Sequence, residues 1–267
     1  MDMHSPRAVV LHGAEGFAGM RKAGRVAAEL LDFLTPHVQP GVTTEALDQL
    51  AADWVTERGH RNGPLGHHGF PRSICTSVNH VVCHGIPGPK ILRDGDIINI
   101  DVTPVVDGWY GDTSRMVFVG TPGVKARRLV DVTYDCLMRA IDVVRPGATL
   151  GDIGHAIQRH AEANRFSVVR EFCGHGVGRT IHAPPDVMHH GRPGTGMVLE
   201  EGMIFTIEPM LNAGRADVMV LADGWTAVTR DKSLSAQFEH SLGVTADGCE
   251  VFTLSPKGWH RPPYDGL

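Results

Sequence analysis

The sequence predicts an α+β fold in which two similar halves share a central antiparallel sheet and carry their helices on the outside. The first observation is a repeat: the tetrapeptide Pro-Gly-Val-Thr at 40–43 returns as Pro-Gly-Ala-Thr at 146–149. The second is that a helical pattern lies before and after each copy, and the third is that each half continues into apolar strands ending at acidic residues. Repetition of this kind indicates structural units that bury their apolar faces against each other.

The four expected helices follow from apolar residues that recur near helical spacing. They cover 19–38 and 44–59 in the first half and 125–144 and 150–166 in the second. An example of the spacing is the set Leu47, Leu50, Ala51 and Trp54. We expect a single domain over 1–267, with halves at about 14–120 and 121–254 and a surface tail at 255–267.

A hairpin in the first half is expected to aim two carboxylates at one point. Asp107-Gly108 lies between two β-rich runs and is a typical two-residue hairpin turn. With that turn, position 101 pairs with 114 and position 112 pairs with 103. Because side chains alternate between the faces of a strand, Asp101 and Asp112 become diagonal neighbours on one face.

The second half supplies acids from matching places. Segment 199–208 aligns with 92–101, since both consist of a turn centred on a glycine and an apolar strand that ends at an acid. Glu208 therefore matches Asp101, and Glu239 matches Asp112. A single acid is more often exposed to solvent, but an acid in an apolar strand requires a partner. The repetition favours a functional site.

Two divalent cations would resolve the repulsion among these four carboxylates, and a neutral histidine would complete the donor set. His175 lies among glycines that allow close backbone approach. Oxygen-rich ligation with one imidazole suits Mn²⁺, Fe²⁺, Co²⁺ or Zn²⁺, and the choice among them stays open. Carboxylates that bridge two ions are typical of hydrolytic two-metal sites.

The remaining histidines divide into two groups. His84, before Gly-Ile-Pro, and His182, before Ala-Pro-Pro, are similar in context and come from different halves. Two pairs of adjacent histidines lack such a context. They are interpreted as ordinary surface or core residues: His67, His68, His189 and His190.

Composition excludes several classes of function. A formal charge of −5 and a pI near 6.3 give no basic surface for nucleic acid or membrane lipid. No apolar stretch is long enough to span a bilayer, and 1–21 shows no signal peptide. Five cysteines at irregular spacing fit free thiols in a reducing compartment, so a cytoplasmic location is expected.

Seven segments together resemble the type I methionine aminopeptidases, which have the pita-bread fold. The resemblance runs from about 19 to 254, and no counterpart of the type II insertion or of an N-terminal extension is visible. The segments are FPRSIC at 70–75, VCHGIP at 82–87, NIDV at 99–102, GDTS at 111–114, GHGVG at 174–178, FTIEPM at 205–210 and SAQFEH at 235–240.

The resemblance assigns roles to the metal ligands. It implies that Asp101 binds one ion, that Asp112 and Glu239 bridge both, and that His175 and Glu208 complete the other site. A monovalent-cation loop is implied at three further positions, Asn79, Val81 and Ser235.

The resemblance also implies the substrate contacts. His84 and His182 match two histidines that contact substrate, and Cys75, which closes the first of the matching segments, is expected to line the substrate site with them. The family's pocket for the methionine side chain is commonly aromatic. Here Phe70 and Trp225 keep that character, whereas His67 and Ile181 depart from it.

The implied activity is hydrolysis of the first peptide bond of nascent proteins and peptides by a metal-activated hydroxide, releasing methionine and favouring a small second residue. His182 would stabilise the oxyanion, His84 would contact the amide nitrogen, and Glu208 would carry protons. A monomer with transient ribosome contact is the expected state. Two alternatives stay open: a proline-specific peptidase of the same fold, which generally carries an additional N-terminal domain, and a non-catalytic binding protein.

Overall fold

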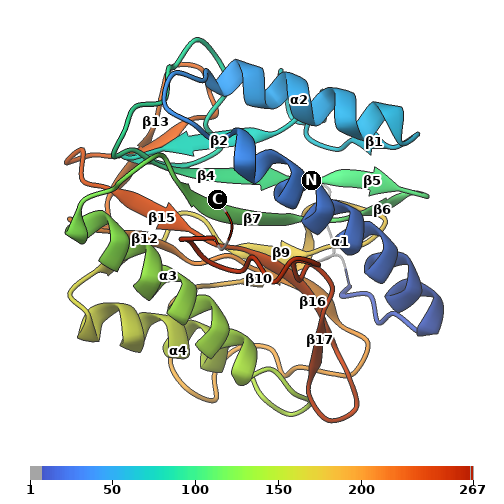
Figure 1. Cartoon of the computed structure of the whole chain (residues 1–267). Coiled ribbons are helices and arrows are strands. Elements are labelled where there is room, and N and C mark those ends of the chain that lie inside the picture. Colours follow the sequence, from blue (N-terminus) through green and yellow to red (C-terminus); the bar gives the residue numbers. More distant parts are fainter. Residues whose placement is uncertain (1–7, 265, 267) are drawn as a thin grey trace, which may run out of the picture.

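The helices expected on either side of each repeat copy are present in the computed structural model, which describes residues 8–264 and 266 (Figure 1). They are α1 (Ala14–Leu34), α2 (Thr44–Glu57), α3 (Val124–Asp142) and α4 (Leu150–Ala163), with 3₁₀ turns at Thr35–His37 and His67–Gly69. In the part of the chain so described, no helix combines the length and apolarity needed to cross a bilayer. The start of the segment interpreted as lacking a signal peptide, 1–7, lies outside the described residues.

The repeated tetrapeptides form equivalent helix entries. Thr43 caps α2 by accepting a hydrogen bond from the backbone N–H of Ala46. Thr149 caps α4 in the same way and forms a capping box with Asp152. The glycine two positions before each threonine has a positive φ, 93° in one copy and 87° in the other. A left-handed turn favours glycine there, which explains why Pro-Gly-X-Thr occurs twice.

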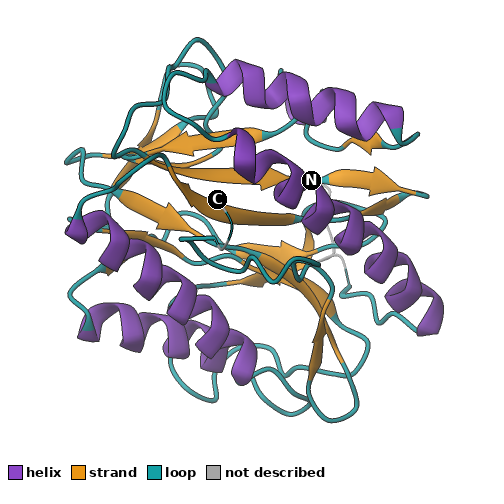
Figure 2. Ribbon diagram, viewed as in Figure 1, coloured by secondary structure: helices purple, strands orange, loops and turns teal. Residues whose placement is uncertain are grey.

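The strands divide between the two halves, with one small sheet that joins them. Figure 2 shows the strands in orange lying between the helices in purple. The first half contains β1 (Arg61–Asn62), β2 (Cys75–Val78), β4 (Ile97–Val102), β5 (Pro104–Val106), β6 (Trp109–Tyr110) and β7 (Thr113–Phe118). The second half contains β8 (Ser167–Val168), β9 (Gly174–Gly176), β10 (Ala183–Val187), β11 (Ile204–Ile207), β12 (Met210–Asn212), β15 (Ser235–Gln237), β16 (His240–Val244) and β17 (Cys249–Val251). The joining sheet pairs β3 (Val81–Cys83) with β14 (Ala227–Thr229) and β13 (Val218–Val220).

The predicted hairpin of the first half is confirmed in its register. Asp101 pairs with Ser114 in the β4–β7 ladder, and Val106 pairs with Trp109 beyond it. Both turn residues have positive φ, 51° at Asp107 and 83° at Gly108, as a tight two-residue turn requires. One register therefore runs through the whole hairpin, and its ladder is interrupted next to Asp112.

The second half repeats this construction with one difference. Ile207 pairs with His240 and Met210 pairs with Gln237, so the same register continues across the interruption and places Glu208 opposite Glu239. In the first half the residue opposite Asp112 is Thr103 rather than the other acid. The two halves meet here, because the backbone N–H of Glu239 donates to the carbonyl of Ser114 (3.1 Å). The interruptions of both hairpins thus lie against each other.

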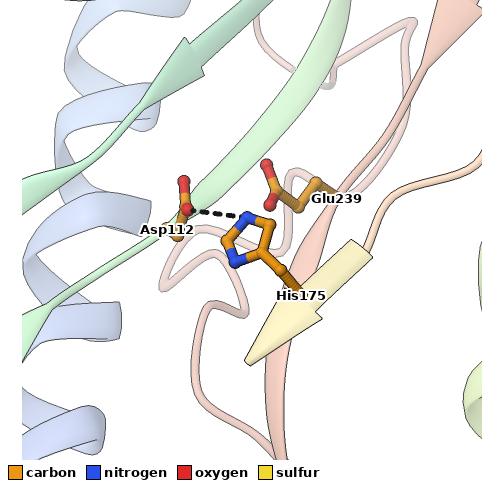
Figure 3. A group of neighbouring side chains, drawn as sticks. All are labelled: Asp112, His175 and Glu239. Carbon is orange, nitrogen blue, oxygen red and sulfur yellow. Dashed lines mark ion pairs between the residues drawn. The ribbon is translucent and has the colours of Figure 1, made fainter. Parts of the chain in front are cut away.

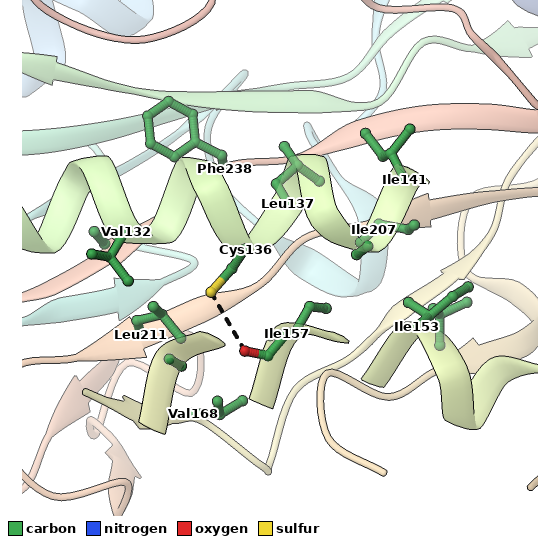
Figure 4. Packing of buried hydrophobic residues seen from close by; sticks show 14 of the residues in the cluster. Val132, Cys136, Leu137, Ile141, Ile153, Ile157, Val168, Ile207, Leu211 and Phe238 are labelled. Carbon is green, nitrogen blue, oxygen red and sulfur yellow. Dashed lines mark hydrogen bonds between the residues drawn. The ribbon is translucent and has the colours of Figure 1, made fainter. Parts of the chain in front are cut away.

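Two apolar cores hold the helices against the sheets. In the second half, α3 and α4 pack on β11, β12 and β16 around fully buried side chains such as Leu137, Ile157 and Ile207 (Figure 4). In the first half, α1 and α2 pack on β2, β4 and β7 around Leu31 and Ile98. Burial of large apolar side chains contributes about 1.5–3 kcal/mol each, so these cores fix the strands that carry the acids.

In the segment interpreted as a surface tail, 255–267, most described residues are exposed or half-buried, but three are buried, and two of these anchor the segment. Ser255 is buried, and its hydroxyl donates to both carboxylate oxygens of Asp32 on α1 (2.8 and 2.9 Å). Tyr264 is 7% exposed and donates its hydroxyl to the carbonyl of Met116 on β7 (2.6 Å). The tail is therefore fastened to the first half at Ser255 and Tyr264. The buried pair of Asp32 with Arg115 (2.7 Å) supplies the polar partner that holds it.

Candidate functional site

Three predicted ligands converge at the junction of the two halves. Asp112 precedes β7, His175 lies in β9, and Glu239 precedes β16. A ligand atom from each lies within 4.8 Å of the other two. Figure 3 shows the three side chains pointing toward a common space from three separate elements. Neutral imidazole and carboxylate donors at this spacing are a typical metal-ligand group.

The other two predicted ligands border the same space. Glu208 Oε1 lies 3.5 Å from Nε2 of His175, and Asp112 Oδ2 lies 3.6 Å from the same nitrogen. Asp101 belongs to β4 and lines the same cavity, of about 250 Å³, as the other four. These five side chains, Asp101, Asp112, His175, Glu208 and Glu239, are called the ligand set below.

Burying the ionised carboxylates of the ligand set close together is energetically unfavourable without a cation. Burial, followed by repulsion from neighbouring carboxylates, raises the pKa of Asp101, Glu208 and Glu239 well above their usual range. Oδ1 of Asp101 is buried with no hydrogen-bond partner among the described residues. Burial lowers the pKa of His175 to about 4, so its ring is neutral and able to ligate. Divalent cations fit this set because they would neutralise the carboxylates and satisfy the unpartnered oxygen.

Polar neighbours that were not predicted orient the ligand set. Nδ1 of His175 lies 3.1 Å from the carbonyl of Gly176, to which it donates, and this leaves Nε2 unprotonated toward the carboxylates. Thr103 donates its hydroxyl to Asp112 (2.9 Å), and Thr206 donates to Glu208 (2.8 Å). The position opposite Asp112 in the predicted hairpin was the only available signal for Thr103.

His189 and Gln237 support Glu208 from two further sides. The backbone N–H of Glu208 donates to Nε2 of His189 (3.3 Å), and the Gln237 amide donates to Oε2 of Glu208 (3.2 Å). His189 is fully buried, which lowers its pKa to about 3. It is therefore a neutral core histidine, in agreement with the sequence interpretation, but one that contacts the site.

The predicted substrate histidines face the ligand set across the cavity. The ring of His182 lies 4.4 Å from the ring of His175, and the pKa values of His84 and His182 are both lowered to about 4, chiefly by burial of the rings. Both residues have positive φ, 54° at His84 and 56° at His182. Strained conformations of this kind in non-glycine residues cluster at functional sites, and here they occur at equivalent places in the two halves.

The wall of the cavity is largely apolar. Phe70 and Trp225 meet edge to face at 5.1 Å between ring centres, and His84 lies between Trp225 and Phe172. The other predicted pocket residues also line the cavity: His67, Cys75 and Ile181. Lining residues that the sequence did not reveal include Pro64, Cys83, Phe172 and Met210. Phe172 lies three positions before His175, which was the one signal that could have found it.

The predicted monovalent-cation loop lies outside this cavity. Asn79 has a φ of 56°, and its carbonyl accepts a hydrogen bond from the backbone N–H of Ser235 (2.8 Å). Val81 begins β3 two positions later. The three residues are thus close together.

Known proteins are similar to the chain over most of its length. The family model for metallopeptidase family M24 matches residues 18–246. The methionine aminopeptidase of Rickettsia prowazekii is 58% identical over 257 residues, which cover 96% of this chain and 99% of that protein. The methionine aminopeptidase of Escherichia coli K12 is 50% identical over 249 residues, which cover 92% and 94% of the two chains.

Solved structures agree with these relatives. The crystal structure of the Rickettsia prowazekii methionine aminopeptidase superposes with a TM-score of 0.92 at 57% identity, covering 92% of this chain and all of that one. A Xaa-Pro dipeptidase from Bacillus anthracis reaches a TM-score of 0.74 at 20% identity, and the match covers 62% of its chain. The second likeness shows the fold alone.

Proposed function

The chain belongs to metallopeptidase family M24 and is a methionine aminopeptidase, which removes the N-terminal methionine of polypeptides, and we propose that its ligand set holds two divalent ions. The observation that carries the proposal is the buried convergence of four carboxylates and one neutral imidazole from both halves of the fold. A non-catalytic relative would have no reason to keep five costly buried ligands. When bound, such ions would lower the pKa of a water molecule, so that hydroxide is available at neutral pH to attack a peptide carbonyl.

Three side chains then act on the peptide and on protons. Oε2 of Glu208 is the proposed proton carrier, and the amide of Gln237 holds that oxygen in place. His182 lies across from the ligand set and would donate an N–H to the developing oxyanion. His84 is held between Phe172 and Trp225 and would contact the amide nitrogen that leaves.

The pocket wall supports selection of methionine. Phe70 and Trp225 provide edges and faces of aromatic rings, and sulfur contacts with such rings are favourable. Cys75 and Ile181 are buried apolar neighbours, and His67 occupies the remaining side. A small residue after the methionine would fit best because His84 and His182 crowd the space beyond the first peptide bond.

Further proposals concern the setting of the enzyme. Its substrates are nascent polypeptides, and a cytoplasmic location is proposed because all five cysteines are free thiols. A monovalent cation is proposed at Asn79, Val81 and Ser235, whose carbonyl and hydroxyl oxygens suit such an ion. The monomeric state and the contact with the ribosome stay predictions.

Removing metal will abolish turnover of a Met-Ala-Ser peptide, and adding Co²⁺ or Mn²⁺ will restore it. An Ala-Pro peptide serves as the comparison, because the proline-specific alternative predicts that it is the better substrate. Released methionine is measured by chromatography, alongside elemental analysis of the purified protein. Full turnover after complete chelation would overturn the metal-dependent mechanism, and preference for Ala-Pro would overturn the specificity.

Chelation will lower the melting temperature more at pH 8 than at pH 6. The pKa values of Asp101, Glu208 and Glu239 are raised in the folded metal-free chain. Protonation of these carboxyl groups therefore stabilises the folded metal-free chain. This stabilisation is complete below the ordinary carboxyl pKa and is lost as pH rises through the raised pKa values of the folded chain. Bound Mn²⁺ prevents this loss of stability because it favours the ionised carboxylates. Thermal unfolding with and without Mn²⁺ at both pH values checks this. A difference in melting temperature between the metal-loaded and metal-free protein that is smaller at pH 8 than at pH 6 would contradict it.

A further inference from the structure

Four imidazole rings form a row from the surface to the ligand set. The ring centre of His68 lies 4.3 Å from that of His67, which lies 5.2 Å from that of His182, which in turn lies 4.4 Å from that of His175. Within the row, one contact is a hydrogen bond: Nε2 of His67 lies 3.3 Å from Nδ1 of His182. No sequence pattern links these two residues, which are 115 positions apart.

The loop that carries His67 holds its ring in place. The backbone N–H of His67 donates to the carbonyl of Pro64 (3.0 Å), and that of Phe70 donates to the carbonyl of His67 (2.9 Å). Gly66 and Gly69 have φ values of 82° and 86°, so the chain turns sharply on either side of the ring. The ring of His67 is half-buried between His68 and His182. It is therefore presented to His182 by a hydrogen-bonded turn rather than by a free loop.

The contact links the tautomers of the two rings, because one of the two facing nitrogens must donate and the other must accept. A neutral imidazole has one N–H, and the hydrogen bond made by one nitrogen fixes the state of the other. Within the described chain, no protein group forms a hydrogen bond with Nε2 of His182, so this nitrogen is available to a peptide in the cavity. If Nδ1 held the proton, Nε2 would be a bare acceptor and could not stabilise an oxyanion.

We propose that His67 is a positioning residue whose Nε2–H donates to Nδ1 of His182 and thereby keeps the proton of His182 on Nε2, toward the scissile carbonyl oxygen. The inference rests on the proposed function for the role of His182. His84 provides a contrast, because its ring forms no hydrogen bond within the described residues and meets Phe172 and Trp225 edge to face. A partner that fixes the tautomer is thus present at the histidine assigned to the oxyanion and not at the one assigned to the leaving amine.

Nitrogen NMR of the zinc-loaded and metal-free proteins tests the tautomer directly. We expect a protonated Nε2 and an unprotonated Nδ1 for His182, with its signals assigned by their loss in His182→Gln. His67→Gln keeps an N–H donor at the same reach and should preserve this state. His67→Met has similar length but no donor, and it should shift the two nitrogen signals toward each other as the tautomers mix. Identical His182 signals in wild type and His67→Met would overturn the proposal.

Kinetics with the Met-Ala-Ser peptide give a second readout. His67→Met should lower kcat by about 10-fold to 100-fold, the range seen when the partner that orients a metal-ligating histidine is lost, with KM changed by less than about 3-fold. His67→Gln should recover most of kcat. His68→Asn is the matched control, because His68 has a φ of 45° that asparagine tolerates and it makes no hydrogen bond to His182.

The two variants separate a hydrogen-bond role from a packing role. Equal loss of kcat in His67→Gln and His67→Met would mean that the ring itself is needed and would overturn the positioning role. An inactive wild-type protein would instead refute the proposed function, and the NMR result would still report on the contact between His67 and His182.

Discussion

Replacing Asp112 by asparagine will reduce turnover of the Met-Ala-Ser peptide by a factor on the order of 10³ or more, as expected for loss of a group that acts as part of a unit. Asp112 is 4% exposed and belongs to the three-residue cluster at the junction of the halves. Asparagine keeps the shape and can still accept the hydrogen bond of Thr103. It removes one of four negative charges, so bound metal in the purified variant should fall together with activity.

Two measurements separate this effect from misfolding. In the metal-free state, burial raises the pKa of Asp112, so removing the carboxylate relieves a cost. Metal-free Asp112→Asn should therefore unfold at no lower temperature than the metal-free wild type. Asp107→Asn is the matched control in the same hairpin, because Asp107 is exposed and has a φ of 51° that asparagine tolerates. Normal metal content and turnover in Asp112→Asn would refute its role as a ligand.

The hairpin shows why much of the site could be predicted from sequence. Asp107-Gly108 specifies a two-residue turn, and a turn of known length fixes the pairing of every residue along both strands. Asp101 and Asp112 therefore had to share a face, and the observed pairing of Asp101 with Ser114 confirms it. Local chemistry and strand periodicity were enough here because the strands are adjacent in sequence.

Contacts between segments distant in sequence could not be predicted in the same way. His67 reaches His182 only because the two halves pack as they do, and His189 reaches Glu208 through the folding of the second half on itself. Both histidines have ordinary sequence surroundings, so their type and spacing carry no signal. The register of the second hairpin also differs from the first, since Glu208 lies opposite Glu239 rather than diagonal to it. The sequence repeat predicted that both hairpins carry acids at matching positions, but not that the strand pairing differs between them.

The anchoring of the tail, 255–267, is another contact between distant segments that the sequence could not predict. It leads to the prediction with the largest effect on stability. Asp32→Asn should lower the free energy of unfolding by about 3–5 kcal/mol, the cost of leaving a buried charge without its partner. Asp32 and Arg115 are 3% and 5% exposed, and their side chains are 2.7 Å apart. The Asp32 carboxylate also accepts both hydrogen bonds of Ser255. Asparagine is nearly isosteric, so the loss reflects charge rather than a cavity.

The corresponding fall in melting temperature is roughly 6–20 °C for a chain of this size, measured on the metal-loaded protein. Glu29→Gln is the matched control on the same helix. Glu29 pairs with Arg25 at 2.6 Å, but both side chains are well exposed, 42% and 61%. Exposed pairs contribute about 0–1 kcal/mol, so this variant should melt within a few degrees of wild type, about 4 °C at most. Equal effects of the two substitutions would contradict the assignment of Asp32 as the buried anchor.

A double variant tests the physical reason for the loss. Arg115→Met in the Asp32→Asn background removes the uncompensated guanidinium, and the methionine stem fills similar space between α1, β7 and the ring of Tyr264. The double variant should therefore be more stable than Asp32→Asn alone, because replacing a whole buried pair is often close to neutral whereas breaking it is not. If the two losses simply add, the cost does not come from an unpaired charge. The tail would then be held by Tyr264 and the hydrogen bonds of Ser255 rather than by the ion pair.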